Sequence, residues 1–222
     1  MENTKTSVII VAGGIGNRMK SEIPKQFLLL GNRPILCHTI RRFYEFDAGI
    51  SIILVLPENQ FEYWAELCVE HDFQIEHQLV KGGDTRFDSV KNGLACISDD
   101  ELVAIHDGVR PLVSQSVISE CFQKAAEYGS AIPVISINES LRSVSNDGSK
   151  IINREEILIV QTPQVFKSAE LKKAYLQEFN ESFTDDASVY ESDGENVALV
   201  DGNRENIKIT QPLDLKIAET LY

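Results

Sequence analysis

The stretch SVIIVAGGIGNRM, residues 7–19, decides the fold, because an uninterrupted apolar run passes directly into glycines. Residues 8–11 are all aliphatic and lack the polar alternation of a half-exposed strand, which is typical of a β-strand buried on both faces. Glycines let a backbone approach a ligand closely, and the cations Arg18 and Lys25 follow them before the next predicted helix. The stretch therefore predicts a buried strand that ends in a binding loop for an anion.

Strand and helix patterns alternate along most of the remaining chain. Apolar runs predict further strands at residues 50–57, 75–80, 102–108, 131–137, 157–166, 196–200 and 206–210. Amphipathic or capped segments predict helices at residues 33–46, 58–72, 85–97, 114–129, 168–179 and 212–222. This rhythm predicts an α/β fold in which helices cover a mostly parallel sheet.

The rhythm breaks at about residue 138. Two short alternating segments flank the turn composition SNDG, residues 145–148, and this arrangement is typical of a β-hairpin. The surrounding residues 139–155 are too polar for a core element. We therefore predict one domain over residues 1–222, with a β-arm at about 138–157 that projects from it.

Composition limits the partners of the protein. Acidic residues outnumber basic ones by 34 to 21, and the formal net charge of −13 argues against a nucleic acid or an anionic membrane. No apolar stretch is long enough to cross a bilayer and the N-terminus lacks a signal peptide pattern, so we expect a cytoplasmic protein. The cysteines form no C-x-x-C pair, which argues against a zinc site. We expect buried, reduced thiols at Cys37, Cys68, Cys96 and Cys121.

Two familiar phosphate-binding patterns do not fit the first loop. The dinucleotide pattern G-x-G-x-x-G would need a glycine at Met19, and the P-loop pattern would need one at Arg18. A tight turn without a ligand is the alternative for this loop alone. The loop is long for a turn, however, and GGDTRFDSV (82–90) and HDGVRP (106–111) also place polar groups directly after strands. Because ligands bind at the carboxyl ends of the strands in open α/β sheets, the three segments together predict one phosphate-binding edge.

Several polar residues also have a purely structural interpretation. Asp107 and Arg110 could form a surface ion pair, and His106 is expected to orient its loop rather than to transfer a proton. Asp185 and Asp186 are typical of the acidic first turn of a helix, with a metal role as the alternative.

Six segments resemble the 2-C-methyl-D-erythritol 4-phosphate cytidylyltransferase family and, more distantly, ribitol-5-phosphate cytidylyltransferase. In chain order they are AGGIGNRM…PKQF, GGDTRFDSV, HDGVRP, QTPQVF, TDDAS and NIKIT. The resemblance implies a Rossmann-like nucleotidyltransferase fold, a three-layer sandwich, and a homodimer in which the β-arm reaches the partner subunit. It also implies a Mg²⁺-dependent reaction in which CTP, the co-substrate, and methylerythritol phosphate give the cytidine diphosphate derivative and pyrophosphate.

The resemblance implies roles for individual residues. Phosphate binding is implied for Gly16, Arg18, Lys25 and Lys208, and the three charged residues are the expected catalytic groups. Cytidine binding is implied for Ala12, Gly13, Gly83, Asp84 and Ser89. Asp107 and Arg110 match positions beside the reacting phosphate, and Asp107 is also the expected carboxylate for Mg²⁺. Contacts with methylerythritol phosphate are implied for Ser140, Arg154, Thr162 and Thr184, the first two across the dimer.

Two positions depart from the family pattern. HDGVRP stands where HDAARP is commoner, which leaves ribitol phosphate open as the acceptor, whereas Ser140 replaces a frequent Thr and keeps the hydroxyl. Two other functions are also open. One is a nicotinamide-dependent oxidoreductase, against which the missing third glycine argues. The other is a nucleotide-sensing module without turnover, against which Arg18, Lys25 and Lys208 argue.

Overall fold

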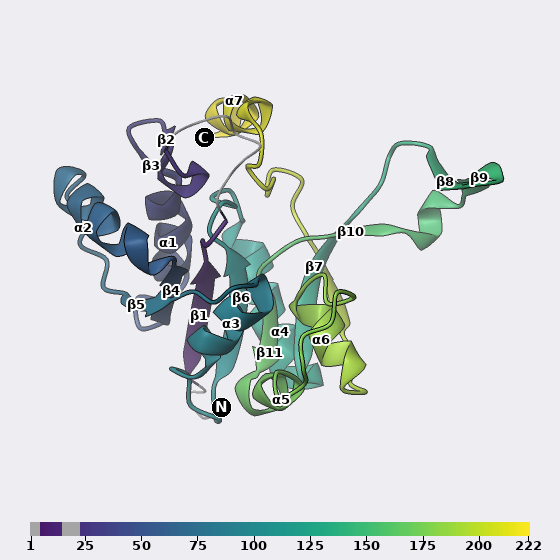
Figure 1. Ribbon diagram of the computed structural model, residues 1–222, viewed down its shortest axis with the longest axis horizontal. Coiled ribbons are helices and arrows are strands. Elements are labelled where there is room, and N and C mark those ends of the chain that lie inside the picture. Colours follow the sequence, from purple (N-terminus) through teal and green to yellow (C-terminus); the bar gives the residue numbers. More distant parts are fainter. Residues whose placement is uncertain (1–4, 15–22) are drawn as a thin grey trace.

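The long apolar runs of the sequence form neighbouring strands of one central sheet. A computed structural model describes residues 5–14 and 23–222 of the chain (Figure 1). In sheet order β6-β1-β4-β5, four strands pair in parallel: β1 (Thr6–Val11), β4 (Ser51–Leu56), β5 (Gln78–Lys81) and β6 (Leu102–Asp107). In register, Ile9 lies opposite Ile53 on one side and Ile105 on the other. Such central aliphatic residues are buried on both faces, as the uninterrupted apolar pattern predicts.

The other half of the sheet is mixed. β11 (Gln164–Lys167) runs antiparallel to both β6 and β7 (Ser130–Ser136), and β10 (Leu158–Val160) also runs antiparallel to β7. β12 (Ala198–Asp201) lies parallel to β7. The predicted mostly parallel sheet is therefore confirmed, with antiparallel pairing confined to the side that carries the arm.

Helices cover both faces of the sheet and give three layers. One apolar cluster lies under α1 (Ile35–Phe46), α2 (Phe61–Glu70) and α4 (Gln115–Tyr128). A second cluster lies under α3 (Arg86–Leu94), α5 (Ser168–Ala174) and α6 (Asp186–Ser192). Because successive strand residues point to opposite faces, Val8 and Ile10 join the first cluster and Ile9 joins the second. A third, smaller cluster lies beneath α7 (Pro212–Leu221).

Helix ends follow the predicted capping chemistry. Ser114 accepts a hydrogen bond from the Val117 N–H at the start of α4, and Gly129 ends that helix with φ = 94°, a conformation that glycine adopts at little cost. Asp185 caps α6 through a reciprocal capping box, so the interpretation of the acidic pair as a helix start is confirmed. None of the helices in the described part of the chain has the length and apolarity that a membrane span requires.

The hairpin predicted around SNDG is present and stands apart from the sheet. It consists of β8 (Leu141–Ser145) and β9 (Gly148–Ile152), which pair only with each other. Figure 1 shows it at the end of two long connections that leave the body of the molecule near β7 and β10.

Three sequence predictions of secondary structure were wrong in detail. The run 157–166 is not one strand but two, β10 and β11, which pair with different stretches of β7. Residues 206–210 form no strand, because their backbone is held by loop contacts such as the 3.0 Å bond from Ile209 N to Val109 O. Residues 75–77 also remain irregular, and β5 begins only at Gln78. The chain between β1 and α1 contributes η2 (Lys25–Phe27), β2 (Leu29–Leu30) and β3 (Arg33–Pro34), and η3 (Glu58–Gln60) precedes α2.

Candidate active site

A cavity of about 430 Å³ lies where β1, β4, β5 and β6 end, at the carboxyl edge of the parallel strands. Open α/β sheets bind their ligands at this edge. Eight of the residues predicted from the sequence line it: Ala12, Gly13, Lys25, Gly83, Asp84, Ser89, Asp107 and Lys208. The three sequence segments that were expected to meet at one edge therefore do so.

Two of the remaining predicted residues, Arg110 and Thr162, lie behind this lining in direct contact with Asp107. Gly16 and Arg18 fall outside the described residues. Ser140 and Arg154 belong to the exposed arm and its base, where Arg154 Nη1 donates to the Asn138 carbonyl. Thr184 lines a separate cavity of about 160 Å³ beside α6. Within one chain, Ser140, Arg154 and Thr184 are not among the residues that line the main cavity.

The wall formed by residues 82–89 is a tightly constrained turn. Ser89 Oγ accepts from the Gly83 N–H at 3.1 Å and donates to the Thr85 carbonyl at 2.9 Å. Thr85 caps α3 in a reciprocal capping box with Asp88. A Cβ at Gly83 would lie 2.2 Å from the Asp88 Cβ, so this position requires glycine. The turn presents backbone to the cavity in one fixed shape.

Lys25 is positioned by the buried residues that follow it in η2. Gln26 Nε2 donates to the Ala12 carbonyl and to Gln60 Oε1, both at 2.8 Å, and so ties η2 to the end of β1. Phe27 stacks on Trp64 with ring centroids 6.0 Å apart. These contacts fix the backbone that carries Lys25 against the glycine segment.

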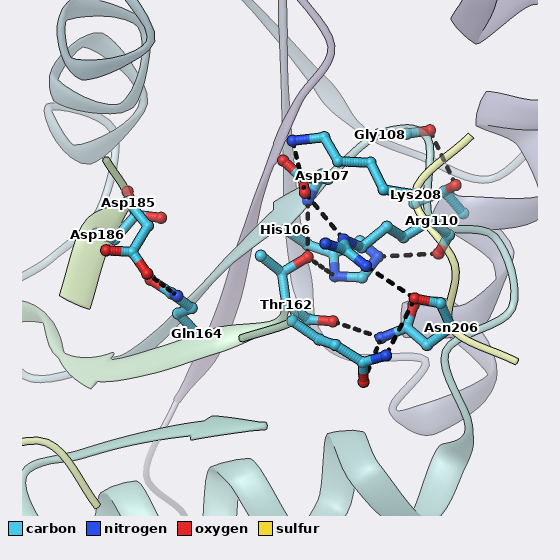
Figure 2. A network of polar contacts seen from close by, with 12 residues as sticks. His106, Asp107, Gly108, Arg110, Thr162, Gln164, Asp185, Asp186, Asn206 and Lys208 are labelled. Carbon is cyan, nitrogen blue, oxygen red and sulfur yellow. Dashed lines mark hydrogen bonds and ion pairs between the residues drawn. The ribbon is translucent and has the colours of Figure 1, made fainter. Parts of the chain in front are cut away.

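Asp107 is the electrostatic centre of the site (Figure 2). Its Oδ2 lies 2.9 Å from Arg110 Nε and 3.1 Å from Lys208 Nζ. Burial alone would raise the pKa of this carboxyl, but the charges of Lys208, Arg86 and Arg110 hold the pKa well below its usual range. The side chains of Arg110 and Asp107 are only 11% and 10% exposed, so the alternative of a surface ion pair was wrong.

His106 is a buried, uncharged residue whose ring contacts both Thr162 and the loop that follows Asp107. The Asp107 N–H donates to Thr162 Oγ1 at 3.1 Å, and the same oxygen lies 3.0 Å from His106 Nδ1. The other ring nitrogen, Nε2, is 3.1 Å from the Arg110 carbonyl. Burial lowers the pKa of His106 to about 4, so the ring stays uncharged at neutral pH. Its contacts orient the loop, which is the role that the sequence predicts.

Sequence reasoning missed Arg86 and Asn206. Arg86 lines the cavity and forms a two-pronged ion pair with the fully buried Asp186, at 2.9 and 2.6 Å. Asn206, also fully buried, donates from Nδ2 to the Thr162 carbonyl at 2.8 Å. Both residues stand inside quoted segments, GGDTRFDSV and NIKIT, but their partners are 100 and 44 residues away.

Comparison with known proteins agrees with this geometry. The 2-C-methyl-D-erythritol 4-phosphate cytidylyltransferase of Bacteroides thetaiotaomicron is 54% identical over 217 residues, which cover 98% of this chain and 99% of the relative. The enzyme of that name from Porphyromonas gingivalis strain W83 is 51% identical over 219 residues, covering 98% and 97%.

Solved structures give the same result. The 2-C-methyl-D-erythritol 4-phosphate cytidylyltransferase of Thermus thermophilus superposes with a TM-score of 0.78 at 30% identity, covering 98% of both chains. The 4-diphosphocytidyl-2C-methyl-D-erythritol synthase of Anaerococcus prevotii reaches a TM-score of 0.83 at 26% identity, covering 98% and 96%. The family itself matches residues 6–222, and the chain therefore belongs to the 2-C-methyl-D-erythritol 4-phosphate cytidylyltransferase family.

Proposed function

We propose that the protein transfers the cytidylyl group of CTP to 2-C-methyl-D-erythritol 4-phosphate. An oxygen of the acceptor phosphate bonds to the α-phosphorus, the bond from that phosphorus to the bridging oxygen breaks, and pyrophosphate leaves. Relatives of this name at 54% identity over nearly the whole chain support the proposal. The observation that carries it is the cavity of about 430 Å³ that a glycine backbone, Lys25, Asp107 and Lys208 all line.

The chemistry explains the residue types around the cavity. A phosphate monoester is already an anion near neutral pH, so the attack needs no strong base. The difficulty is that one polyanion approaches another, and catalysis becomes positioning and charge stabilisation. Lys25, with Arg18 from outside the described residues, would neutralise the charge that gathers on the α-phosphate and the pyrophosphate. Lys208 would hold the incoming phosphate, with Arg110 beside it.

The nucleoside would occupy the other end of the cavity. Gly83 permits close approach of backbone, and Asp84 and Ser89 supply polar groups for the base or ribose. Ala12 and Gly13 complete this wall from the end of β1, and Gly16 belongs to the same proposed loop. Because a Cβ at Gly83 would collide with Asp88, the shape of this wall depends on glycine.

Mg²⁺ is part of the proposal and would be carried mainly by the substrate. Mg²⁺ commonly binds one or two carboxylates together with substrate phosphates. Asp107 fits this donor set as a buried carboxylate on the cavity wall, and among the described residues no three acidic, His or Cys side chains gather into a metal cluster. The ion would supply positive charge to the phosphate oxygens.

A homodimer would explain the predicted residues that lie away from the cavity. Ser140 and Arg154 would reach the acceptor bound to the partner subunit, and Thr162 and Thr184 would contribute from the sheet side. The exposed fractions of Val144 and Ile151 on the hairpin, 81% and 78%, support an intersubunit role because large apolar side chains gain from being covered. A cytoplasmic location stays a prediction.

Pyrophosphate release tests the function. With CTP and Mg²⁺, methylerythritol phosphate should give release at a rate at least about tenfold above ribitol phosphate, a discrimination of about 1.4 kcal/mol. Equal rates, or faster release with ribitol phosphate, would favour the ribitol enzyme. Release with neither acceptor, together with thermal stabilisation by CTP, would favour a nucleotide sensor, and stabilisation by NAD(H) alone would favour an oxidoreductase.

A further inference from the structure

The segment that carries Lys208 has no regular secondary structure. Residues 202–210 lie between β12 and α7 without strand or helix. Lys208 Nζ is nevertheless held 3.1 Å from Asp107 Oδ2. Strands and helices position side chains through repeated backbone hydrogen bonds, so an irregular segment needs other contacts to position a phosphate-binding lysine to within a fraction of an ångström.

A closed ring of hydrogen bonds supplies these contacts (Figure 2). Arg110 donates from Nε to Asp107 Oδ2 at 2.9 Å and from Nη1 to the Asn206 carbonyl at 2.8 Å. Asn206 Nδ2 donates to the Thr162 carbonyl at 2.8 Å, and Thr162 Oγ1 accepts from the Asp107 N–H at 3.1 Å. The ring therefore joins β6, the loop after it, the turn before β11 and the Lys208 segment.

Asn206 holds this ring at a cost. Its side chain is fully buried, and its Oδ1 has no hydrogen-bond partner among the described residues. A buried acceptor without a partner is unfavourable for folding, and such atoms are rare in native proteins.

We propose that Asn206 is a positioning residue that aligns Lys208, Arg110 and Asp107 for the acceptor phosphate. The inference rests on the proposed function of Lys208 and Arg110 as groups beside that phosphate. Asn206 acts through its neighbours. Its side-chain Nδ2 donates to the Thr162 carbonyl and so anchors the segment two residues before Lys208. Its backbone carbonyl, held in place by that anchor, accepts from Arg110 Nη1 and orients the guanidinium. CTP, bound by the opposite wall of the cavity, should be insensitive to it.

Asn206→Asp is the decisive variant, because aspartate keeps the shape and loses the Nδ2 donor. We expect kcat/KM for methylerythritol phosphate to fall at least about tenfold, while the Kd of CTP stays within about twofold. Asn206→Ala, which adds no charge, replaces it if the aspartate variant does not fold. Ser130→Ala is the matched control, because Ser130 is also fully buried and donates to a backbone carbonyl, of Asn196, outside the ring.

Lys208→Ala, measured in parallel, separates the two levels of the proposal. If Lys208→Ala impairs acceptor turnover and both Asn206 variants behave like Ser130→Ala, the role of Asn206 is wrong and that of Lys208 stands. If Lys208→Ala itself keeps wild-type kinetics, Lys208 does not bind the acceptor phosphate, and the proposed role of Asn206 is wrong as well. Equal weakening of CTP and acceptor binding in the Asn206 variants would indicate general loosening and would also overturn the inference.

Discussion

The hydrogen-bonded ring of Asp107, Arg110, Thr162 and Asn206, here called the corner, differs from the β8–β9 arm in burial and in the contacts that fix it. At the corner, Asp107, Thr162 and Asn206 are buried and joined in one ring of hydrogen bonds. On the arm, Val144 and Ile151 are 81% and 78% exposed, and the two strands pair only with each other. A single chain thus determines the geometry of the corner, whereas it leaves the arm uncovered. Changes at the corner should alter chemistry, and changes on the arm should alter assembly.

The largest expected effect is on chemistry. Lys25→Ala should leave the fold intact and lower kcat by about 10²–10³-fold, about 3 kcal/mol, because a preorganised cation is lost where charge develops. The KM for CTP should rise much less. Steady-state kinetics with both substrates measures this. Lys173→Ala is the control, because Lys173 is a surface residue of α5 that forms an ion pair with Asp193 away from the cavity. Activity within threefold of wild type would remove Lys25 from the mechanism.

A smaller effect, on assembly, is expected from the arm. Arg154 bonds the Asn138 carbonyl, so the two ends of the arm are adjacent and residues 139–152 can be deleted with little strain. We expect a folded monomer with poor acceptor binding and unchanged CTP binding, measured by light scattering and kinetics. The double variant Val144→Ser and Ile151→Ser should weaken the dimer without shortening the chain. A deletion variant that remains dimeric would contradict the intersubunit role.

The pH dependence of stability should separate the corner from the rest of the molecule. The pKa of His106 falls from 6.5 to about 4 on folding, so the unfolded chain binds the proton more readily. The contribution of His106 to the free energy of unfolding is therefore fully present above pH 6.5. It decreases by about 3 kcal/mol as the pH falls through 4. Urea unfolding between pH 7.5 and 4.5 measures it.

His106→Gln should reduce the pH dependence of the free energy of unfolding, whereas Ser130→Ala, at another fully buried polar position without a titratable side chain, should leave it unchanged. Identical slopes for His106→Gln and wild type would assign the acid sensitivity to other groups.

The smallest effect is expected at Cys96. The expectation of four buried thiols was wrong here, because Cys96 is exposed beyond the end of α3, whereas Cys37 and Cys121 are buried. Burial raises the pKa of Cys37 to about 12 and that of Cys68 to about 11. One thiol per native chain should therefore react rapidly with an aromatic disulfide reagent. Cys96→Ser should abolish that phase and change stability by no more than about 0.5 kcal/mol; rapid labelling of a second thiol would contradict this assignment.

Much of the cavity could be predicted because its segments are local patterns. The apolar run before Gly13 indicates a strand that ends in a loop, and GGDTRFDSV indicates a turn that opens a helix. Parallel strands bring such ends to one edge, so eight predicted residues meet there. The prediction of a strand at residues 206–210 was wrong because their apolar side chains do not pack against the sheet: Ile209 belongs to the small apolar cluster beneath α7.

The sequence by itself determined most of the order of strands and helices, the hairpin and eight of the residues that line the cavity, because periodicity and turn chemistry act over a few positions. Only the tertiary structure decided how these residues are held. Arg110 and Asn206 are 96 residues apart, and Arg86 and Asp186 are 100 apart. Such partners meet only when the sheet brings distant strand ends together, and no local pattern records which of the many buried polar groups will face each other.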